Sequence, residues 1–377
     1  MKKLFSTNSV VLPLVLSFIV ASPAILGDSE NFLRKSNGEK MVLLQDQPQG
    51  LMARNVSEKS FSVNPNLKIQ YYDKRYAVII VGYFKDSQHY KWFTTDAQRQ
   101  YDILTKKYNF SDNDIYMLVT QKKEWADNLS MNPAIIYYNA TKTNISMVFS
   151  HLASVIDEDD LLYIVVIDHG GDTHHLFFTR LGFDIDFRQG IFAYDTYFAL
   201  EKTGNSSKDA LISHQYLGKN NSQSENYDRI FDHELNEYTK NIHARRIIFA
   251  LQPCFSGGFI NDLSGINHVV LTASTEAQQA NAPFIGYFSS GLNGSANDRN
   301  HDGRISLGEI YEYTADMVYK WIQNNPEGNG NRSQYPLIDD NGDKIGHHND
   351  DFGYRPDAQN KDGYVAARIY DLSYEEI

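Results

Sequence analysis

The sequence predicts an α/β protein in three layers, with a mostly parallel sheet covered by helices on both faces. Short apolar runs such as Leu161 to Ile167 and Ile247 to Leu251 have the length and composition of strands buried on both sides. Between these runs lie longer segments whose apolar residues recur at helical spacing. Strands that alternate with helices in this way form parallel sheets with helices packed on each face.

The alternation starts near Arg75. In the segment 88–108, for example, Ala97, Tyr101 and Leu104 recur at roughly helical spacing. Strands are expected at 76–83, 115–120, 161–167, 247–251 and 269–273, and helices at 88–108, 141–156, 225–242 and 309–323. The long, aromatic and irregular segment 176–224 is expected to form an excursion, with a β-hairpin, that walls a substrate cleft.

The N-terminus has the order of a secretory signal peptide. Lys2 and Lys3 precede an apolar stretch from Val10 to Val20, and small residues follow up to Gly27. We therefore divide the chain into a signal peptide (1–27), a propeptide or N-terminal arm (28–72), an α/β domain (73–285) and a C-terminal extension (286–377). Export to the medium or the cell surface is expected, with no stable membrane span after cleavage; a retained anchor is the alternative.

The net charge and the cysteine content limit which partners and which chemistry are expected for the chain. The formal net charge of −12 argues against a nucleic-acid partner, because binding to phosphates requires excess positive charge. With one cysteine, an exported chain cannot form an internal disulfide, so that the thiol is available for chemistry. The sequence carries no signal for an oligomeric state.

The single thiol and an imidazole follow two of the expected strands. Cys254 lies just after the strand 247–251 and is followed by Phe255-Ser256-Gly257-Gly258, and His169 lies just after the strand 161–167 and is followed by Gly170. Ligands and active sites lie at the carboxyl ends of strands in open parallel sheets.

This pattern predicts a cysteine hydrolase, most naturally a peptidase. His169 would hold the proton of the Cys254 thiol and deliver it to the leaving group. The main-chain amides of Gly170 and Cys254 would bind the oxyanion. His174 and His175 compete with His169 as the base and are favoured instead as cleft lining. Hydrolysis through Ser256 is a weaker alternative, since the Gly-x-Ser-x-Gly elbow is absent.

A calcium loop is expected from Asp298 to Glu309, which fits the twelve-residue EF-hand pattern. Gly303 supplies the sharp turn, and several Gly and Ser residues at 284–297 weigh against a regular entering helix. The expected ligands are Asp298, Asn300, Asp302, the Arg304 carbonyl, Ser306 through water, and Glu309. A second acidic stretch, 339–343, lacks a closing Glu, and both a second calcium site and a solvated loop remain open for it.

The strand-His-Gly-Gly motif followed by strand-x-x-Cys-x-Ser-Gly-Gly resembles the clan CD cysteine peptidases. The layout is most similar to the legumain family, particularly its microbial members with a calcium-loop insertion, over about Arg75 to Ala280. The resemblance implies a caspase-like fold, endopeptidase or transpeptidase activity, His169 and Cys254 as the catalytic dyad, and synthesis as a zymogen.

Two positions depart from the family. Animal and plant legumains have an Arg just before the first helix, which helps to bind an Asn or Asp side chain, and here the best match is Trp92 or Phe93. They also have Glu after the catalytic cysteine, where this chain has Phe255. An apolar or aromatic first pocket is therefore an alternative to asparaginyl specificity.

The leading expectation is a secreted, calcium-stabilised cysteine endopeptidase that acts on peptide or protein substrates. A transpeptidase or ligase would use the same dyad and pass the acyl group to an amine. The third possibility is a non-catalytic calcium-binding surface protein that kept the fold, against which the intact dyad and its flanking glycines argue.

Overall fold

The computed structural model describes residues 68–82, 87–120, 136–172, 196–201, 227–325 and 333–377. The chain divides into two compact units, Met1–Lys59 and Ser60–Ile377, and all described residues belong to the second unit. The expected signal peptide and most of the expected N-terminal arm lie outside the described residues.

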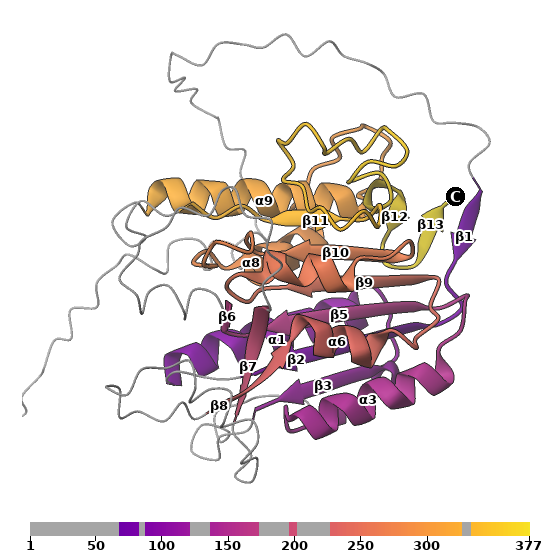
Figure 1. The fold of residues 1–377 in the computed structure, drawn as a ribbon. Helices are drawn as coiled ribbons and strands as arrows, with labels where there is room; N and C mark the ends of the chain where they lie inside the picture. Colours follow the sequence, from indigo (N-terminus) through magenta and orange to yellow (C-terminus); the bar gives the residue numbers. More distant parts are fainter. Residues whose placement is uncertain (1–67, 83–86, 121–135, 173–195, 202–226, 326–332) are drawn as a thin grey trace, which may run out of the picture. The chain divides into compact units, whose positions relative to one another are not determined.

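A seven-stranded sheet forms the centre of the second unit (Figure 1). Its strand order is β11-β10-β9-β5-β2-β3-β4, and every neighbouring pair is parallel except β10 and β11. The strands are β2 (Arg75–Val81), β3 (Ile115–Val119), β4 (Ile136–Tyr138), β5 (Leu161–Ile167), β9 (Arg246–Leu251), β10 (His268–Thr272) and β11 (Leu337–Asp339).

The apolar runs form strands because both faces of the sheet are covered. In β2, Ala77 and Ile79 face one core cluster, and Val78 and Ile80 face the other. Every residue of β5 is buried. Since side chains alternate between the two faces of a strand, only a continuous apolar run can supply both clusters.

Helices pack against each face of the sheet. The helices of the first face are α1 (Ser87–Lys106), α8 (Phe284–Ser290) and α9 (Leu307–Asn324), and those of the second are α3 (Lys142–Val155), α6 (Asp232–Thr239) and α7 (Ile260–Leu263). Side chains cap some of these helices: Thr141 accepts a hydrogen bond from the Asn144 amide at the start of α3. Within the described ranges, no helix has both the length and the hydropathy that a membrane span requires.

Two three-stranded sheets flank the central sheet. One has the order β1-β13-β12 and the other β6-β7-β8, and all of their strand pairs are antiparallel. Their strands are β1 (Ile69–Tyr71), β12 (Ile369–Tyr370), β13 (Tyr374–Glu376), β6 (Gly170–Asp172), β7 (Thr196–Glu201) and β8 (Tyr227–Phe231). Short helical turns lie at η2 (Asp112–Asp114), η4 (Ser256–Phe259), η5 (Gly291–Ser295) and η6 (Ala366–Arg368).

The expected α/β class with a mostly parallel sheet is confirmed. The expected helix at 225–242 is wrong in its first part, because Tyr227–Phe231 pairs with β7 as a strand. The expected excursion 176–224 contributes β7, and its other residues lie outside the described part of the chain. α8 and the π-helical turn η5 precede the candidate calcium loop despite the glycines and serines of this segment.

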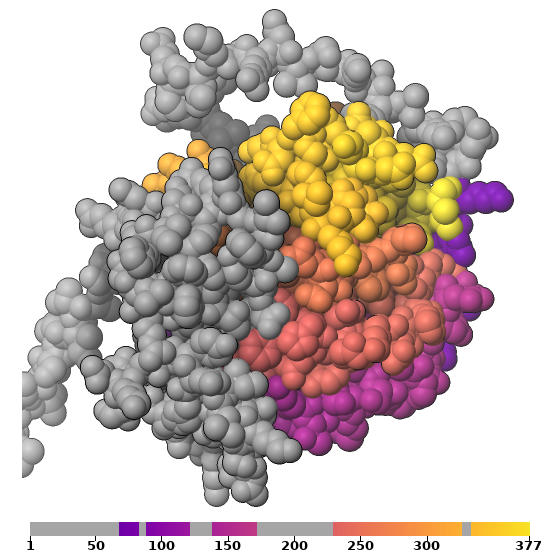
Figure 2. Space-filling model, viewed as in Figure 1, coloured from indigo at the N-terminus to yellow at the C-terminus, as the bar shows by residue number. Residues whose placement is uncertain are grey.

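The C-terminal residues belong to the same compact unit as the sheet. β11 adds an edge strand beside β10, and side chains of α9 join the core cluster of the first face. Figure 2 shows the C-terminal residues (yellow) packed against the middle of the chain (orange). The segment 286–377, expected as an extension, therefore completes the sheet and one of its two cores.

We predict that Asp96 makes the protein less stable at neutral pH than at acid pH. The side chain is 15% exposed, and burial raises its pKa to about 6 although Arg99 lies 3.0 Å away. Because the folded state then binds more protons than the unfolded state, the free energy of unfolding falls as pH rises from about 4 to 6. Asp96→Asn should raise it at pH 7 by up to about 3 kcal/mol, and the gap should close below pH 4.

Urea unfolding between pH 4 and pH 8 measures this effect. Asp102→Asn is the matched control, because Asp102 is a 38% exposed carboxylate on the same helix. Parallel stability profiles for the wild type and Asp96→Asn would contradict the prediction.

Candidate active site and candidate calcium loop

The pairing of β5 with β9 places the thiol and the imidazole at one edge of the sheet. The two strands are parallel neighbours, with Val166 opposite Leu251, and the Gln252 amide extends the ladder by donating to the Val166 carbonyl at 3.0 Å. His169 lies two residues after β5, and Cys254 lies three residues after β9. The expectation that both residues come from adjacent parallel strand ends is confirmed.

The carboxyl-terminal edge of the sheet also includes its topological switch point, which lies between β2 and β5. The chain leaves β2 for α1 on one face, and after β5 it reaches α6 on the other face. Crevices form where successive connections diverge in this way. The first turns of α1 therefore lie beside His169.

Two aromatic rings of α1 lie beside the imidazole of His169. The ring centroids of His89 and Phe93 lie 5.1 Å and 5.2 Å from that of His169. Trp92 is 48% exposed and lies 5.4 Å from His89, whereas Phe93 is only 8% exposed. Of the two residues matched to the specificity-determining arginine of legumains, Phe93 is the one that contacts His169. His89 was not predicted, although its spacing of four residues from Phe93 places both on one helical face.

A hydrogen bond between two of its own residues holds the turn after β5. Asp168 is buried, and its carboxylate accepts the His169 main-chain N–H at 2.6 Å. Gly170 begins strand β6 and lies opposite Phe198 of β7. The proposed oxyanion donor is thus part of a flanking sheet. His174 and His175, the competing bases, lie outside the described residues.

The loop 273–282, here called the thiol loop, closes around Cys254. The Ala280 amide donates to the Cys254 Sγ at an N···S distance of 3.3 Å, and the Phe255 amide donates to the Gln278 carbonyl at 2.8 Å. Phe255 has a φ of 64°, in the left-handed region. This conformation costs a non-glycine residue about 1–2 kcal/mol. The chain is therefore held in a strained turn directly after the nucleophile candidate.

Ser256 and Gly257 have structural roles in the same turn. Ser256 is fully buried, and its Oγ accepts the Ala273 amide at 3.1 Å. A Cβ added at Gly257 would lie 2.6 Å from the Glu276 nitrogen and 2.7 Å from the Thr275 carbonyl carbon. Only a glycine therefore allows the thiol loop to approach this closely.

The candidate calcium loop turns sharply around its own polar side chains. The Asp298 carboxylate accepts the amides of Asp302 at 3.1 Å and Gly303 at 2.8 Å. Asn300 Oδ1 also accepts the Asp302 amide, at 2.9 Å. Gly303 has a φ of 83°, a conformation that favours glycine. The sharp turn expected at this position is present.

Glu309 closes the loop from the start of α9. Its carboxylate accepts the amide of Arg299 at 2.7 Å, and it forms a capping box with Ser306. The donor set is made of oxygen atoms, which suits Ca²⁺. In the residues that the structure describes, however, no three Asp, Glu, His or Cys side chains gather closely enough to hold a metal ion. The backbone and donor chemistry fit calcium, and the carboxylates would have to converge on the ion.

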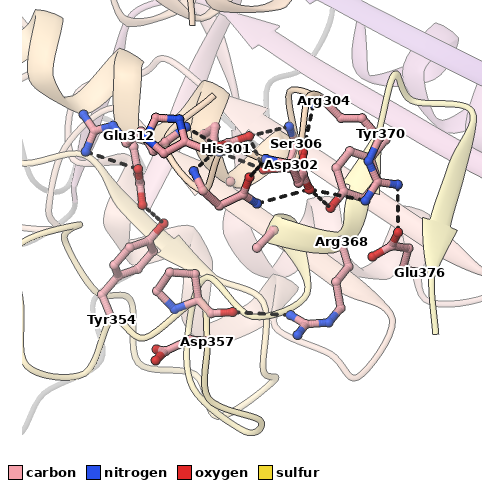
Figure 3. A pocket seen from close by; sticks show the side chains of 16 residues that line it. His301, Asp302, Arg304, Ser306, Glu312, Tyr354, Asp357, Arg368, Tyr370 and Glu376 are labelled. Atoms are coloured by element: carbon pink, nitrogen blue, oxygen red, sulfur yellow. Dashed lines mark hydrogen bonds and ion pairs between the residues drawn. The ribbon is translucent and has the colours of Figure 1, made fainter. Parts of the chain in front are cut away.

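A pocket of about 610 Å³ borders the loop (Figure 3). Tyr370 donates to Asp302 at 3.1 Å, and Arg304 pairs with Glu376 at 2.7 Å across this pocket. Neither Cys254 nor His169 lines it. The pocket therefore belongs to the loop and to the C-terminal strands, apart from the candidate dyad.

The second acidic stretch repeats the turn of the first. Asp339 Oδ2 accepts the Lys344 amide at 3.2 Å, and Asn341 Oδ1 accepts the Asp343 amide at 2.8 Å. Gly342 and Lys344 have φ values of 79° and 70°, as His301 and Gly303 have 60° and 83° in the first loop. The equivalence escapes the sequence pattern because Lys344 occupies the position of the glycine.

Comparisons with known proteins do not assign a family. No protein-family model matches the chain, and no curated protein matches it. Among solved structures, the chain is similar to the crystal structure of protein GSU0716 from Geobacter sulfurreducens, with 12% identity and a TM-score of 0.36. That match covers 65% of this chain and 89% of the other.

We predict that Gly257→Ala displaces the thiol loop. The added Cβ would meet main-chain atoms of Thr275 and Glu276, which cannot rotate away. The variant should lose about 1–3 kcal/mol of unfolding free energy, and the alkylation rate of Cys254 should change.

Gly286→Ala is the matched control. A Cβ there would have ordinary contacts of 3.5–3.9 Å in α8, so the change should be neutral or stabilising by up to about 1 kcal/mol. Equal stability of both variants in urea unfolding would contradict this account of Gly257.

Proposed function

We propose that the protein is a secreted or cell-surface cysteine endopeptidase of caspase- or legumain-like fold, made as a zymogen. The observation that supports this most is the adjacency of β5 and β9, because it brings the ends that bear His169 and Cys254 to one edge. The closeness of α1 to His169 supports a cleft at the same edge.

In the proposed reaction, the Cys254 thiolate adds to the carbonyl carbon of the scissile peptide bond. The carbonyl oxygen takes the negative charge and accepts hydrogen bonds from the Cys254 and Gly170 amides. The C–N bond then breaks, and His169 gives the proton taken from the thiol to the leaving amine. Water then attacks the resulting thioester and gives a proton to His169, the C–S bond breaks, and the acid product leaves with the thiolate and the protonated His169 restored.

The substrate side chain next to the scissile bond would meet an aromatic surface. Phe93 of α1 lies beside His169, and the half-exposed Trp92 lies beside His89 on the same helix. No described residue of this α1 turn supplies the arginine of asparaginyl peptidases. This favours an apolar or aromatic residue at the cleavage position.

The second part of the proposal is a structural calcium ion in the loop from Asp298 to Glu309. Asp298, Asn300, Asp302, the Arg304 carbonyl, Ser306 through water and Glu309 would hold it. The ion would neutralise the facing carboxylates and fix the start of α9, whose side chains belong to the core beneath the sheet. It would take no part in peptide hydrolysis.

The dyad is tested with a peptide library read by mass spectrometry. Cys254→Ala should abolish cleavage, and His169→Ala should lower kcat by about 10²–10⁴-fold. Ser256→Ala should keep thiol-dependent cleavage and lose stability, because the Ser256 hydroxyl accepts a buried amide. Cleavage that survives Cys254→Ala would contradict the proposal, and peptide products longer than the substrates would indicate acyl transfer to amines.

The calcium loop is tested by calorimetry and thermal unfolding. Calcium at 100 times its Kd should add about 2.7 kcal/mol of unfolding free energy, and Glu309→Gln and Asp298→Asn should remove that gain. Asp357→Asn is the matched control, since this exposed carboxylate lines the same pocket outside the loop. An equal calcium response in Asp298→Asn would contradict the assignment.

A further inference from the structure

Three consecutive residues hold the thiol loop from outside. They are Ser333, Gln334 and Tyr335, here called the tether, and they lie just before β11. β11 pairs with β10, and the thiol loop starts where β10 ends. The antiparallel pairing of β10 and β11, which lie side by side in Figure 1, therefore brings the tether and the thiol loop together.

Gln334 joins the two ends of the thiol loop with one carboxamide. Its Oε1 accepts the amides of Asn281 at 2.7 Å and Ala282 at 2.8 Å, and its Nε2 donates to the Ala273 carbonyl at 3.0 Å. The residue is only 3% exposed. Buried hydrogen bonds of this kind are costly to break, because a buried donor or acceptor that loses its partner cannot form a hydrogen bond to water instead.

The rest of the tether holds the middle of the loop. Gln278 Nε2 donates to the Ser333 Oγ at 2.7 Å, and Gln278 Oε1 accepts the Tyr335 amide at 2.9 Å. The Gln278 carbonyl in turn accepts the Phe255 amide, next to the nucleophile candidate.

The loop atom that meets the thiol is one residue from the Gln334 contacts. Ala280 donates its main-chain N–H to the Cys254 Sγ, and Asn281 and Ala282 are the residues that Gln334 fixes. The thiol also donates to the Ala280 carbonyl at a long S···O distance of 3.9 Å, which favours the protonated form, whereas the nearer N–H that points at the sulfur stabilises the thiolate. The benefit depends on an N–H held in place before the proton leaves.

We infer that Gln334 is a positioning residue for Cys254, which holds the Ala280 N–H against the sulfur and thereby stabilises the thiolate. The inference rests on the proposed role of Cys254 as nucleophile. It adds to that role the tether, a segment that lies 80 residues along the chain from Cys254 and touches no reacting atom.

The test is the rate of alkylation of Cys254 by iodoacetamide as a function of pH, on the full chain. Cys254 is the only cysteine, so the label reports one site. In the wild type the midpoint should lie below about 8.5, the ordinary value for a thiol. Gln334→Met keeps the volume and removes the three hydrogen bonds, and should raise the midpoint by about one pH unit, a tenfold loss of thiolate at neutral pH.

Gln100→Met is the matched control. Gln100 is also a fully buried glutamine with two side-chain hydrogen bonds, to Ser289 and Tyr163, and it does not touch the thiol loop. It should lower thermal stability and leave the alkylation midpoint unchanged. Gln334→Asn, which keeps a shorter carboxamide, should restore part of the wild-type midpoint.

An unchanged midpoint in folded Gln334→Met would overturn the inference. If that variant does not fold, Gln278→Met decides, because it frees the loop from Ser333 and Tyr335 at a position that is only partly buried: a raised midpoint supports the tether, and an unchanged one overturns it. The experiments distinguish the failure of this inference from the failure of the proposed function. If tether variants shift the alkylation midpoint but no peptide is cleaved, the inference stands and the peptidase proposal fails. If cleavage depends on Cys254 but the midpoint does not respond to the tether, the peptidase proposal stands and the inference fails.

Discussion

The parallel pairing of β5 with β9 is the constraint on which the candidate site depends. Parallel neighbours end at the same edge, so the residues that follow them lie at that edge, where open sheets of this kind bind ligands. β2 lies on the other side of β5, and the chain that leaves β2 forms α1 on the first face, so that the start of α1 also reaches this edge beside His169. Strand order thus brings the segments that bear Cys254 and His169 to one edge, where His89 and Phe93 of α1 lie beside His169.

The strands place the segment that bears Cys254, and hydrogen bonds from residues far along the chain then hold the atoms around the thiol in position. Phe255, the residue after Cys254, has a left-handed backbone, and strain of this kind persists only where surrounding contacts determine the backbone. Those contacts come from Gln278, Ala280 and Ser256, and the thiol loop is in turn held by Gln334. The C-terminal residues therefore bear on the nucleophile candidate, although the candidate calcium loop lies in a separate pocket.

Much of the architecture is predictable because burial on both faces leaves a strong signal. The strand 161–167 has the predicted bounds, and α1, α3 and α9 lie within two residues of the predicted ones. The sequence pattern predicts a helix that starts at 225, but 227–231 is the strand β8, because its pairing with β7 decides its conformation. β11, with three residues, is too short for periodicity to reveal, and only its place beside β10 makes it a strand.

The sequence by itself determined the α/β class, the two strand ends that bear Cys254 and His169, and the sharp turn at Gly303, because each depends on local pattern or on residue type at fixed spacing. The tertiary structure decided that His89 and Phe93 face His169, that Gln334 reaches the thiol loop, and that 339–345 repeats the turn of the first loop. Those relations join residues far apart in the chain or depend on backbone angles that Lys344 adopts against its usual preference. Neither leaves a spacing that a sequence pattern can detect.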